Sequence, residues 1–180
     1  MSKKETIKIA VHAGHAVKGA RGASALMDEV TVNRKLKKHV IKYLKKMGAT
    51  VIDCSVHEGS AWDVLAGIRS KFLRKSKETY GWHNISIHLN AGGGNGVEVW
   101  TRAGITSHLD TMLKRFCGTT GFKNRGVRRS SSLYVLNNLP NCQLWEVGFV
   151  DSKRDKAIYD RLGVKQIAKY MAESIMLYAK

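Results

Sequence analysis

Residues 84–89 read Asn-Ile-Ser-Ile-His-Leu, and residues 91–96 after them read Ala-Gly-Gly-Gly-Asn-Gly. The first run is short and largely apolar, which predicts a strand, whereas the second predicts a glycine-rich turn. The turn leaves room for a ligand beside His88 and Asn90, at the end of the expected strand.

Similar short apolar runs alternate along the chain with longer stretches in which apolar residues recur at helical spacing. The expected strands span residues 7–11, 50–54, 84–89, 97–101, 133–136 and 143–149. The expected helices span residues 29–47, 61–77, 106–117 and 153–178. This alternation predicts an α/β fold, a single domain with a twisted, largely parallel sheet flanked by helices.

The chain is strongly basic. Its 180 residues, about the size of one domain, include 31 Lys and Arg against 14 Asp and Glu, for a net charge of +17. Such a charge attracts polyanions and carries no information about the fold. The anionic partner indicated by charge alone is a nucleic acid, a membrane surface or a cell-wall polymer.

The cysteines and the N-terminus indicate the compartment. Cys54, Cys117 and Cys142 are odd in number and irregularly spaced, so we expect reduced, mostly buried thiols rather than a disulfide framework or a zinc ribbon. The first residues lack the apolar core and cleavage site of a secretory signal. No apolar run approaches the ~20 residues of a membrane span. We therefore expect synthesis in the cytoplasm without a signal peptide.

Three separated fragments carry the candidate chemistry. His15 follows the first expected strand, His88 ends the third, and Glu146 lies in the last. In parallel sheets, ligands bind at the carboxyl ends of strands, so these side chains are expected at one edge. With Glu29 at the start of the first helix, His15 and His88 supply two imidazoles and one carboxylate. That set fits a catalytic zinc ion, which keeps a position open beside three protein ligands. Glu146 is the expected acid/base group.

The fragments resemble the zinc-dependent N-acetylmuramoyl-L-alanine amidases of the amidase 3 type. The resemblance rests on Ala13-Gly14-His15, Glu29 followed by Asn33, Ser86-Ile87-His88-Leu89-Asn90-Ala91 and Leu144-Trp145-Glu146-Val147-Gly148-Phe149, and it extends over residues 7–178. The family often has Asp-Pro-Gly-His-Gly-Gly where this chain has His12-Ala13-Gly14-His15-Ala16-Val17. Of the two histidines we favour His15 as the ligand, because His12 lies further back in the strand.

The resemblance implies hydrolysis of the amide between N-acetylmuramic acid and the L-alanine of the peptidoglycan stem peptide. It implies Zn²⁺ held by His15, Glu29 and His88, which activates water and polarises the carbonyl. Glu146 would take the proton of the water and pass it to the leaving amine. Asn90 and Glu98 are candidate substrate-binding residues, although Glu98 could instead pair with Arg102.

We expect one catalytic amidase domain over residues 1–180, without a separate wall-binding domain within them, so that the chain is either complete or a catalytic fragment. A bacteriophage or prophage endolysin or an autolysin fits best, acting on the cell wall after release. Its partner is peptidoglycan, and basic patches would contact anionic wall polymers or a membrane surface.

Two alternatives remain open at this point. Charge alone motivates a nucleic-acid-binding module, but the chain has no zinc finger or RRM signature, so no specific nucleic acid is expected. A zinc peptidase that cuts within the stem peptide is the other alternative, since His88 and Glu146 alone do not exclude it.

Overall fold

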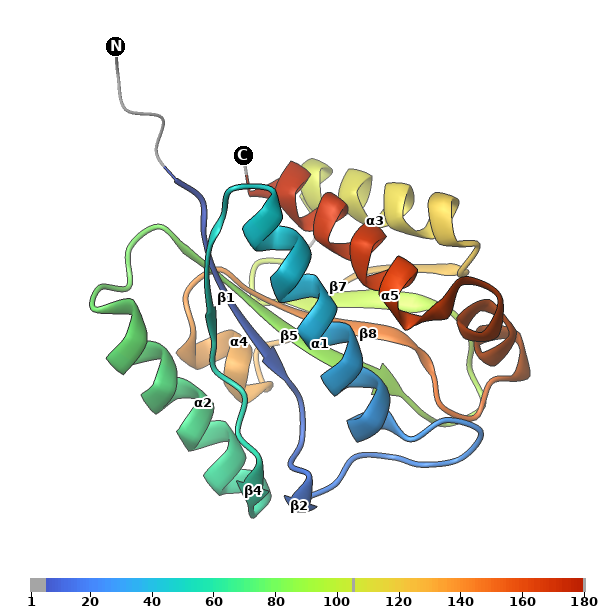
Figure 1. The fold of residues 1–180 in the computed structure, drawn as a ribbon, viewed down its shortest axis with the longest axis horizontal. Coiled ribbons are helices and arrows are strands. Elements are labelled where there is room, and N and C mark those ends of the chain that lie inside the picture. Colours follow the sequence, from blue (N-terminus) through green and yellow to red (C-terminus); the bar gives the residue numbers. More distant parts are fainter. Residues whose placement is uncertain (1–5, 105, 180) are drawn as a thin grey trace.

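A computed structural model describes residues 6–104 and 106–179, which form an α/β domain around a six-stranded sheet. In spatial order the strands are β3 (Thr50–Asp53), β1 (Lys8–Ala13), β5 (Trp82–Asn90), β8 (Cys142–Phe149), β6 (Val97–Thr101) and β7 (Asn124–Arg129). Only the β6–β8 pair is antiparallel, and the other neighbours run parallel. The expected α/β fold with a largely parallel sheet is confirmed (Figure 1).

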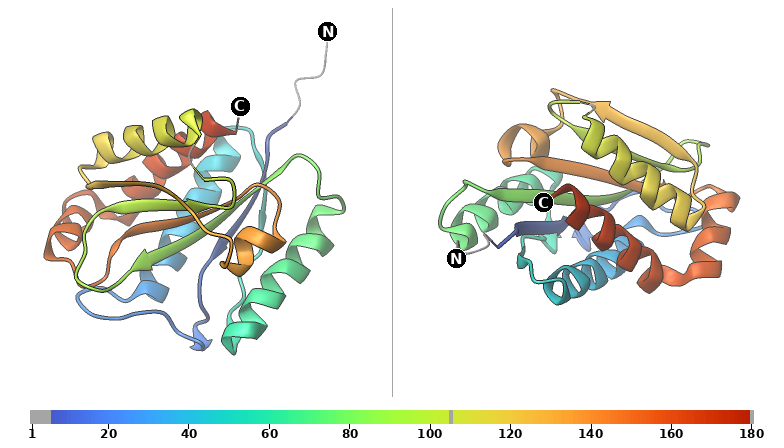
Figure 2. Two further views of the ribbon diagram at one scale, coloured as in Figure 1. Left: turned by 180° about the vertical axis from the view of Figure 1, so that it is seen from behind. Right: turned by 90° about the horizontal axis from the view of Figure 1, so that it is seen from above.

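Helices cover the two faces of the sheet unequally. The long helices α1 (Glu29–Lys46), α3 (Ser107–Thr120) and α5 (Lys153–Tyr178) lie on one face. On the other face lie α2 (Ala61–Ser76) and the short α4 (Tyr134–Asn138) (Figures 1 and 2). A second, two-stranded sheet pairs β2 (Lys18–Gly19) with β4 (Glu58–Gly59).

Alternation along β5 explains why the two faces differ. Ile85, Ile87 and Leu89 join the larger hydrophobic core, beneath the three long helices. Ser86 and His88 alternate with them and line a pocket between the sheet, α2 and α4. Because successive side chains of a strand point to opposite faces, this one strand contributes both to the core and to a polar site.

The expected strand at residues 133–136 is wrong. Tyr134–Asn138 forms the short helix α4, which buries Val135 and Leu136 against the smaller core cluster. A four-residue apolar run does not by itself distinguish a strand from a buried helical turn.

The true strand before it, β7, is not among the expected elements. Its sequence Asn-Arg-Gly-Val-Arg-Arg is polar, and Val127 is the residue that it buries in the larger core. As an edge strand, β7 pairs with β6 through backbone hydrogen bonds, which hydropathy does not reveal.

The closing helix also departs from the expectation. Helix α5 is interrupted at Gly163, where φ is 72° and ψ is 150°. Glycine tolerates this conformation because it has no Cβ. Gly163 therefore divides the expected continuous helix over residues 153–178 into two segments.

Two expectations concern the compartment. Cys54, Cys117 and Cys142 are all buried and unpaired, as expected. Within residues 6–104 and 106–179, no helix is both long and apolar enough to cross a bilayer. Residues 1–5, which bear on the expected lack of a signal peptide, lie outside the described residues.

Candidate metal centre and catalytic site

His15 lies just beyond the end of β1, in a loop that is tied to β5. The backbone N–H of Gly14 donates to the carbonyl oxygen of Ile87 at 2.9 Å, and Asn33 Nδ2 donates to the Gly14 carbonyl at 3.0 Å. A Cβ at position 14 would stand 1.9 Å from Cε1 of His88. Glycine is therefore needed for the loop to approach the His88 ring.

Glu29 is the first residue of α1, and the two adjacent acids there have separate tasks. Asp28 is the N-cap and accepts from the backbone N–H of Thr31 at 2.8 Å. Glu29 is buried, and its Oε1 accepts from the backbone N–H of Leu89 at 3.1 Å while its Oε2 accepts from that of Ala23 at 3.0 Å. These bonds aim the carboxylate at the end of β5 instead of at solvent.

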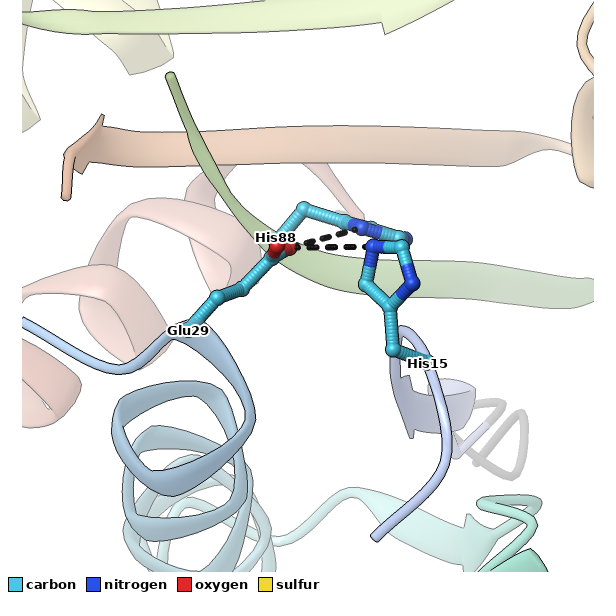
Figure 3. Close-up of side chains that lie close together, drawn as sticks. All are labelled: His15, Glu29 and His88. Atoms are coloured by element: carbon cyan, nitrogen blue, oxygen red, sulfur yellow. Dashed lines mark hydrogen bonds and ion pairs between the residues drawn. The ribbon is translucent and has the colours of Figure 1, made fainter. Parts of the chain in front are cut away.

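The three expected ligands converge. Oε1 of Glu29 stands 3.3 Å from Nε2 of His15 and 3.2 Å from Nδ1 of His88. The two imidazole rings meet edge to face, with centroids 5.1 Å apart (Figure 3). One ligand atom from each residue lies within 4.8 Å of the others. Two imidazole nitrogens and one carboxylate oxygen are the donors of many catalytic zinc sites, so the set fits this metal.

His12 does not join this cluster. It lies in β1 beside Ser86 and is fully buried. Burial, with the charge on His88 adding to it, lowers the pKa of His12 to about 3. The geometry thus favours His15 over His12 as the ligand.

The triad is also electrostatically coupled. Burial raises the pKa of Glu29, but hydrogen bonds and charges from His15 and His88 outweigh it and leave that pKa well below its usual range. Burial lowers the pKa of His88, but the hydrogen bond to Glu29 and the charges of Glu146 and Glu29 outweigh it and leave the pKa raised. A proton therefore competes with a metal ion for His88.

Glu146 stands beside the triad on the next strand. It is in register with His88 on β5 and with Glu98 on β6. Burial raises the pKa of Glu146 to about 7; the charge of His88 opposes this, and the charges of Glu29 and Glu98 add to it. Its Oε2 is buried without a hydrogen-bond partner among the described residues. An orphaned buried carboxylate oxygen next to three metal-ligand atoms indicates a place for a ligand or reactant.

Asn90 and Glu98 lie with Glu146 in a cavity of about 340 Å³, which Trp100 and Ser132 also line. Glu98 pairs with Arg125 and Arg128, not with Arg102 as the sequence allowed. Neither arginine is among the site residues expected from the sequence. In the sequence both arginines lie in a basic run, and Arg125 also lies in Asn124-Arg125-Gly126-Val127, which resembles the family stretch before Glu146.

A second cavity, of about 330 Å³, is lined by His15 and His88. Helix α2 contributes apolar side chains to it, and Leu133 and Tyr134 line it at the start of α4. Ser132, Leu133 and Leu144 line both cavities. His15 and His88 therefore line a largely apolar cavity, and Glu146 lines the adjoining cavity with Glu98.

Comparison with known proteins gives the family of the chain. A family model described as N-acetylmuramoyl-L-alanine amidase matches residues 9–176. An uncharacterized protein of Clostridium perfringens is 33% identical over 180 residues, which cover 94% of this chain and 51% of that protein. The chain spans about half the length of the curated relatives that it matches first.

Two further relatives have a stated activity or role. The N-acetylmuramoyl-L-alanine amidase CwlM of Bacillus licheniformis is 35% identical over 77 residues, 39% of this chain and 30% of that protein. The solved catalytic domain of an endolysin targeting Clostridia difficile is 27% identical, with a TM-score of 0.75 over 94% of this chain and 97% of that domain.

Proposed function

Because the chain belongs to the amidase 3 family of N-acetylmuramoyl-L-alanine amidases, we propose that it hydrolyses peptidoglycan at the amide between N-acetylmuramic acid and L-alanine. The observation that carries the proposal is the convergence of His15, Glu29 and His88 beside Glu146. These residues come from a loop, a helix start and two strands, so their meeting is a product of the fold.

In this proposal His15, Glu29 and His88 hold a zinc ion. When bound, zinc polarises the substrate carbonyl and lowers the pKa of a water molecule. Glu29 is already fixed by two backbone N–H groups, and Gly14 leaves space for the His88 ring. The ligands are thus preorganised, as metal binding at a defined geometry requires.

Glu146 is the proposed general base and then general acid. It removes a proton from the attacking water and delivers it to the nitrogen of the leaving L-alanine. Its raised pKa, about 7, supports the role, since a proton carrier works best near the ambient pH. A cation at the triad would lower this pKa, because a nearby positive charge favours the carboxylate.

Asn90 is proposed to contact substrate in the cavity that it shares with Glu146. Glu98 belongs to the same substrate region but is itself buried. All of these residues lie in one domain, and we propose this domain as the complete catalytic unit.

We propose peptidoglycan as the substrate and the cell wall as the place of action, in an endolysin or autolysin. The basic surface would attract anionic wall polymers or a membrane surface, since residues 111–144 contain no acid and the net charge is +17. Cell-wall lysis is then expected to slow as salt rises, because salt screens exposed charges. An unchanged rate across a salt series would count against this part.

The decisive test is digestion of purified peptidoglycan with and without EDTA, followed by mass spectrometry. We expect metal-dependent release of intact stem peptides that begin with free L-alanine. Cleavage inside the stem peptide would identify a peptidase, and intact peptidoglycan under zinc-replete conditions would contradict the proposal.

A further inference from the structure

Glu98 has no capacity left for a substrate. Its side chain is buried, and it accepts four hydrogen bonds from three strands. Oε1 accepts from Asn90 Nδ2 at 3.1 Å and Trp100 Nε1 at 3.2 Å. Oε2 accepts from Nε of Arg125 at 2.8 Å and Nε of Arg128 at 3.0 Å. A carboxylate offers about four acceptor positions, so Glu98 positions other residues.

A β-bulge brings the two arginines together. Positions 125 and 128 are three apart, and regular strand alternation would send their side chains to opposite faces. Here two steps on β6, from Val97 to Val99, face three steps on β7, from Asn124 to Val127. Gly126 lies within the extra step with a φ of 90°. The bulge restores both arginines to the face of Glu98, as bulges beside active sites often re-aim side chains.

The guanidinium groups of Arg125 and Arg128 are held in place, but part of their hydrogen-bonding capacity remains unused. Arg125 lies 4.8 Å from the centroid of the Phe149 ring, and Arg128 lies 5.8 Å from that of Trp100. Each arginine gives its Nε to Glu98, and the terminal amino groups make no hydrogen bond within the described part of the chain. The Arg128 side chain is 44% exposed, so a ligand can reach it. Two positive charges face one carboxylate, which leaves an excess positive charge.

We propose that Arg125 and Arg128, held by Glu98, form a subsite for a carboxylate of the stem peptide. This inference rests on the proposed function. Arginine matches carboxylates through paired N–H donors. The muramic acid carboxyl group is consumed in the amide that is cut, whereas the stem peptide carries free carboxylates. The subsite therefore assigns the peptide side of the substrate to the β6–β7 edge.

The spacing agrees with this direction. Glu98 is two strands away from His88 in the sheet, a separation of about 10 Å at the usual strand spacing. An extended peptide covers about 10 Å in three residues. The carboxylate that the arginines bind thus belongs to a residue within about three positions of the cleaved amide.

The test measures binding rather than turnover. The ligand is the stem peptide beginning with L-alanine, in a form with free carboxylates and in a form with those carboxylates amidated. Isothermal titration is done with zinc-loaded full chain carrying Glu146→Gln. We expect amidation to weaken binding about 10-fold or more, as the loss of a charge-assisted pair does.

Arg128→Gln in the same background should weaken binding of the free acid by about 10-fold and leave the amidated peptide unaffected. Arg128→Lys should retain part of the preference, because it keeps the charge but not the paired donors. Arg129→Gln is the matched control, since it removes the neighbouring exposed charge and should change neither affinity. Melting curves establish that each variant is folded.

Equal affinities for the acid and the amide would overturn the subsite, as would an equal loss for both ligands on Arg128→Gln. The outcome is independent of the amidase reaction itself. If the unmodified chain leaves peptidoglycan intact, the proposed function fails, and a preference for the acid that depends on Arg128 would still establish the carboxylate subsite.

Discussion

The two faces of the central sheet differ in what they bury. Under α1, α3 and α5, the strands contribute Ile87, Val99, Trp145 and similar side chains to one continuous apolar core. On the opposite face, the same strands carry His88 on β5, Glu146 on β8 and Glu98 on β6, which lie in register with one another. Because neighbouring residues on one strand serve these two faces, stability and chemistry are separated by a single step in sequence.

The difference in cover explains how the second face accommodates charge. Helices α2 and α4 pack a smaller apolar cluster there, which includes Ala10, Phe72 and Leu144. On this face, residues of β5 and β8 line two cavities instead of packing under a long helix. A buried charge is costly unless it is paired or binds a metal, so the polar residues are gathered into two groups, around Glu29 and around Glu98.

The largest expected effect is on kcat and comes from the sheet face that carries His88, Glu98 and Glu146. Glu146→Gln removes the proposed proton carrier and should reduce kcat by about 10²- to 10⁴-fold, the usual contribution of general acid–base catalysis. Zinc binding should remain at one ion per chain, because the three ligands are untouched. Steady-state hydrolysis of a soluble muropeptide and metal analysis of the variant check both parts. A kcat within a few-fold of the unmodified chain would remove Glu146 from the mechanism.

Trp145, one position earlier on β8, lies on the core face, so its replacement should mainly affect the free energy of unfolding. It is fully buried against Phe116, with ring centroids 5.5 Å apart. Trp145→Ala should lower the free energy of unfolding by about 3–5 kcal/mol, because it leaves a large cavity. Denaturant unfolding measures the loss. The matched control is Trp62→Ala, whose side chain is 64% exposed and should cost far less. Equal losses would show that the core face is not the stabilising one.

The ion pair between Glu29 and His88 should make zinc affinity and metal-free stability depend on pH in opposite directions. The imidazole must be neutral to bind metal. Each proton that competes with the metal should therefore lower zinc affinity about tenfold for every pH unit below the raised pKa of His88. Competition with a chromogenic chelator between pH 5 and 8 measures this. Affinity independent of pH in that range would contradict His88 as a ligand.

Without metal, the contribution of His88 to folding stability should decrease, not increase, as pH rises. The raised pKa of His88 stabilises the fold fully below its ordinary value of 6.5, and this contribution is lost as pH rises through the folded-state pKa. The depressed pKa of Glu29 contributes above its ordinary value of 4.5 and is lost as pH falls. In EDTA, the melting temperature of the His88→Gln variant should therefore fall furthest below that of the unmodified chain between pH 4.5 and pH 6.5. His108→Gln, on exposed α3 surface, is the control.

The smallest effects come from an adjacent pair on β5. Ile87→Val removes one methylene group from the larger core and should cost about 0.5–1.5 kcal/mol. Ser86→Ala, on the opposite face, removes a buried hydroxyl without a hydrogen-bond partner among the described residues, so it should be neutral or slightly stabilising. Precise denaturant midpoints for both variants are sufficient. A larger loss for Ser86→Ala would indicate that its hydroxyl has a bonding role.

The sequence by itself determined the α/β class and the main strands and helices, and it predicted the residues of the candidate centre. Strands such as residues 84–89 carry their own apolar signal, and Glu29 lies in the first turn of its helix, where an acid is favoured. Local signals failed where burial was slight or the run was short, as in β7 and α4. Neither element is specified by periodicity alone.

Only the tertiary structure decided which charges meet. Arg125 and Arg128 face Glu98 because a bulge at Gly126 shifts the register of β7, and Asp28 and Glu29 separate because only the second reaches β5. Register and bulges arise from backbone hydrogen bonds between strands that are distant in sequence. No residue pattern within one segment encodes them, so the charged cavity beside Glu146 was apparent only in the folded chain.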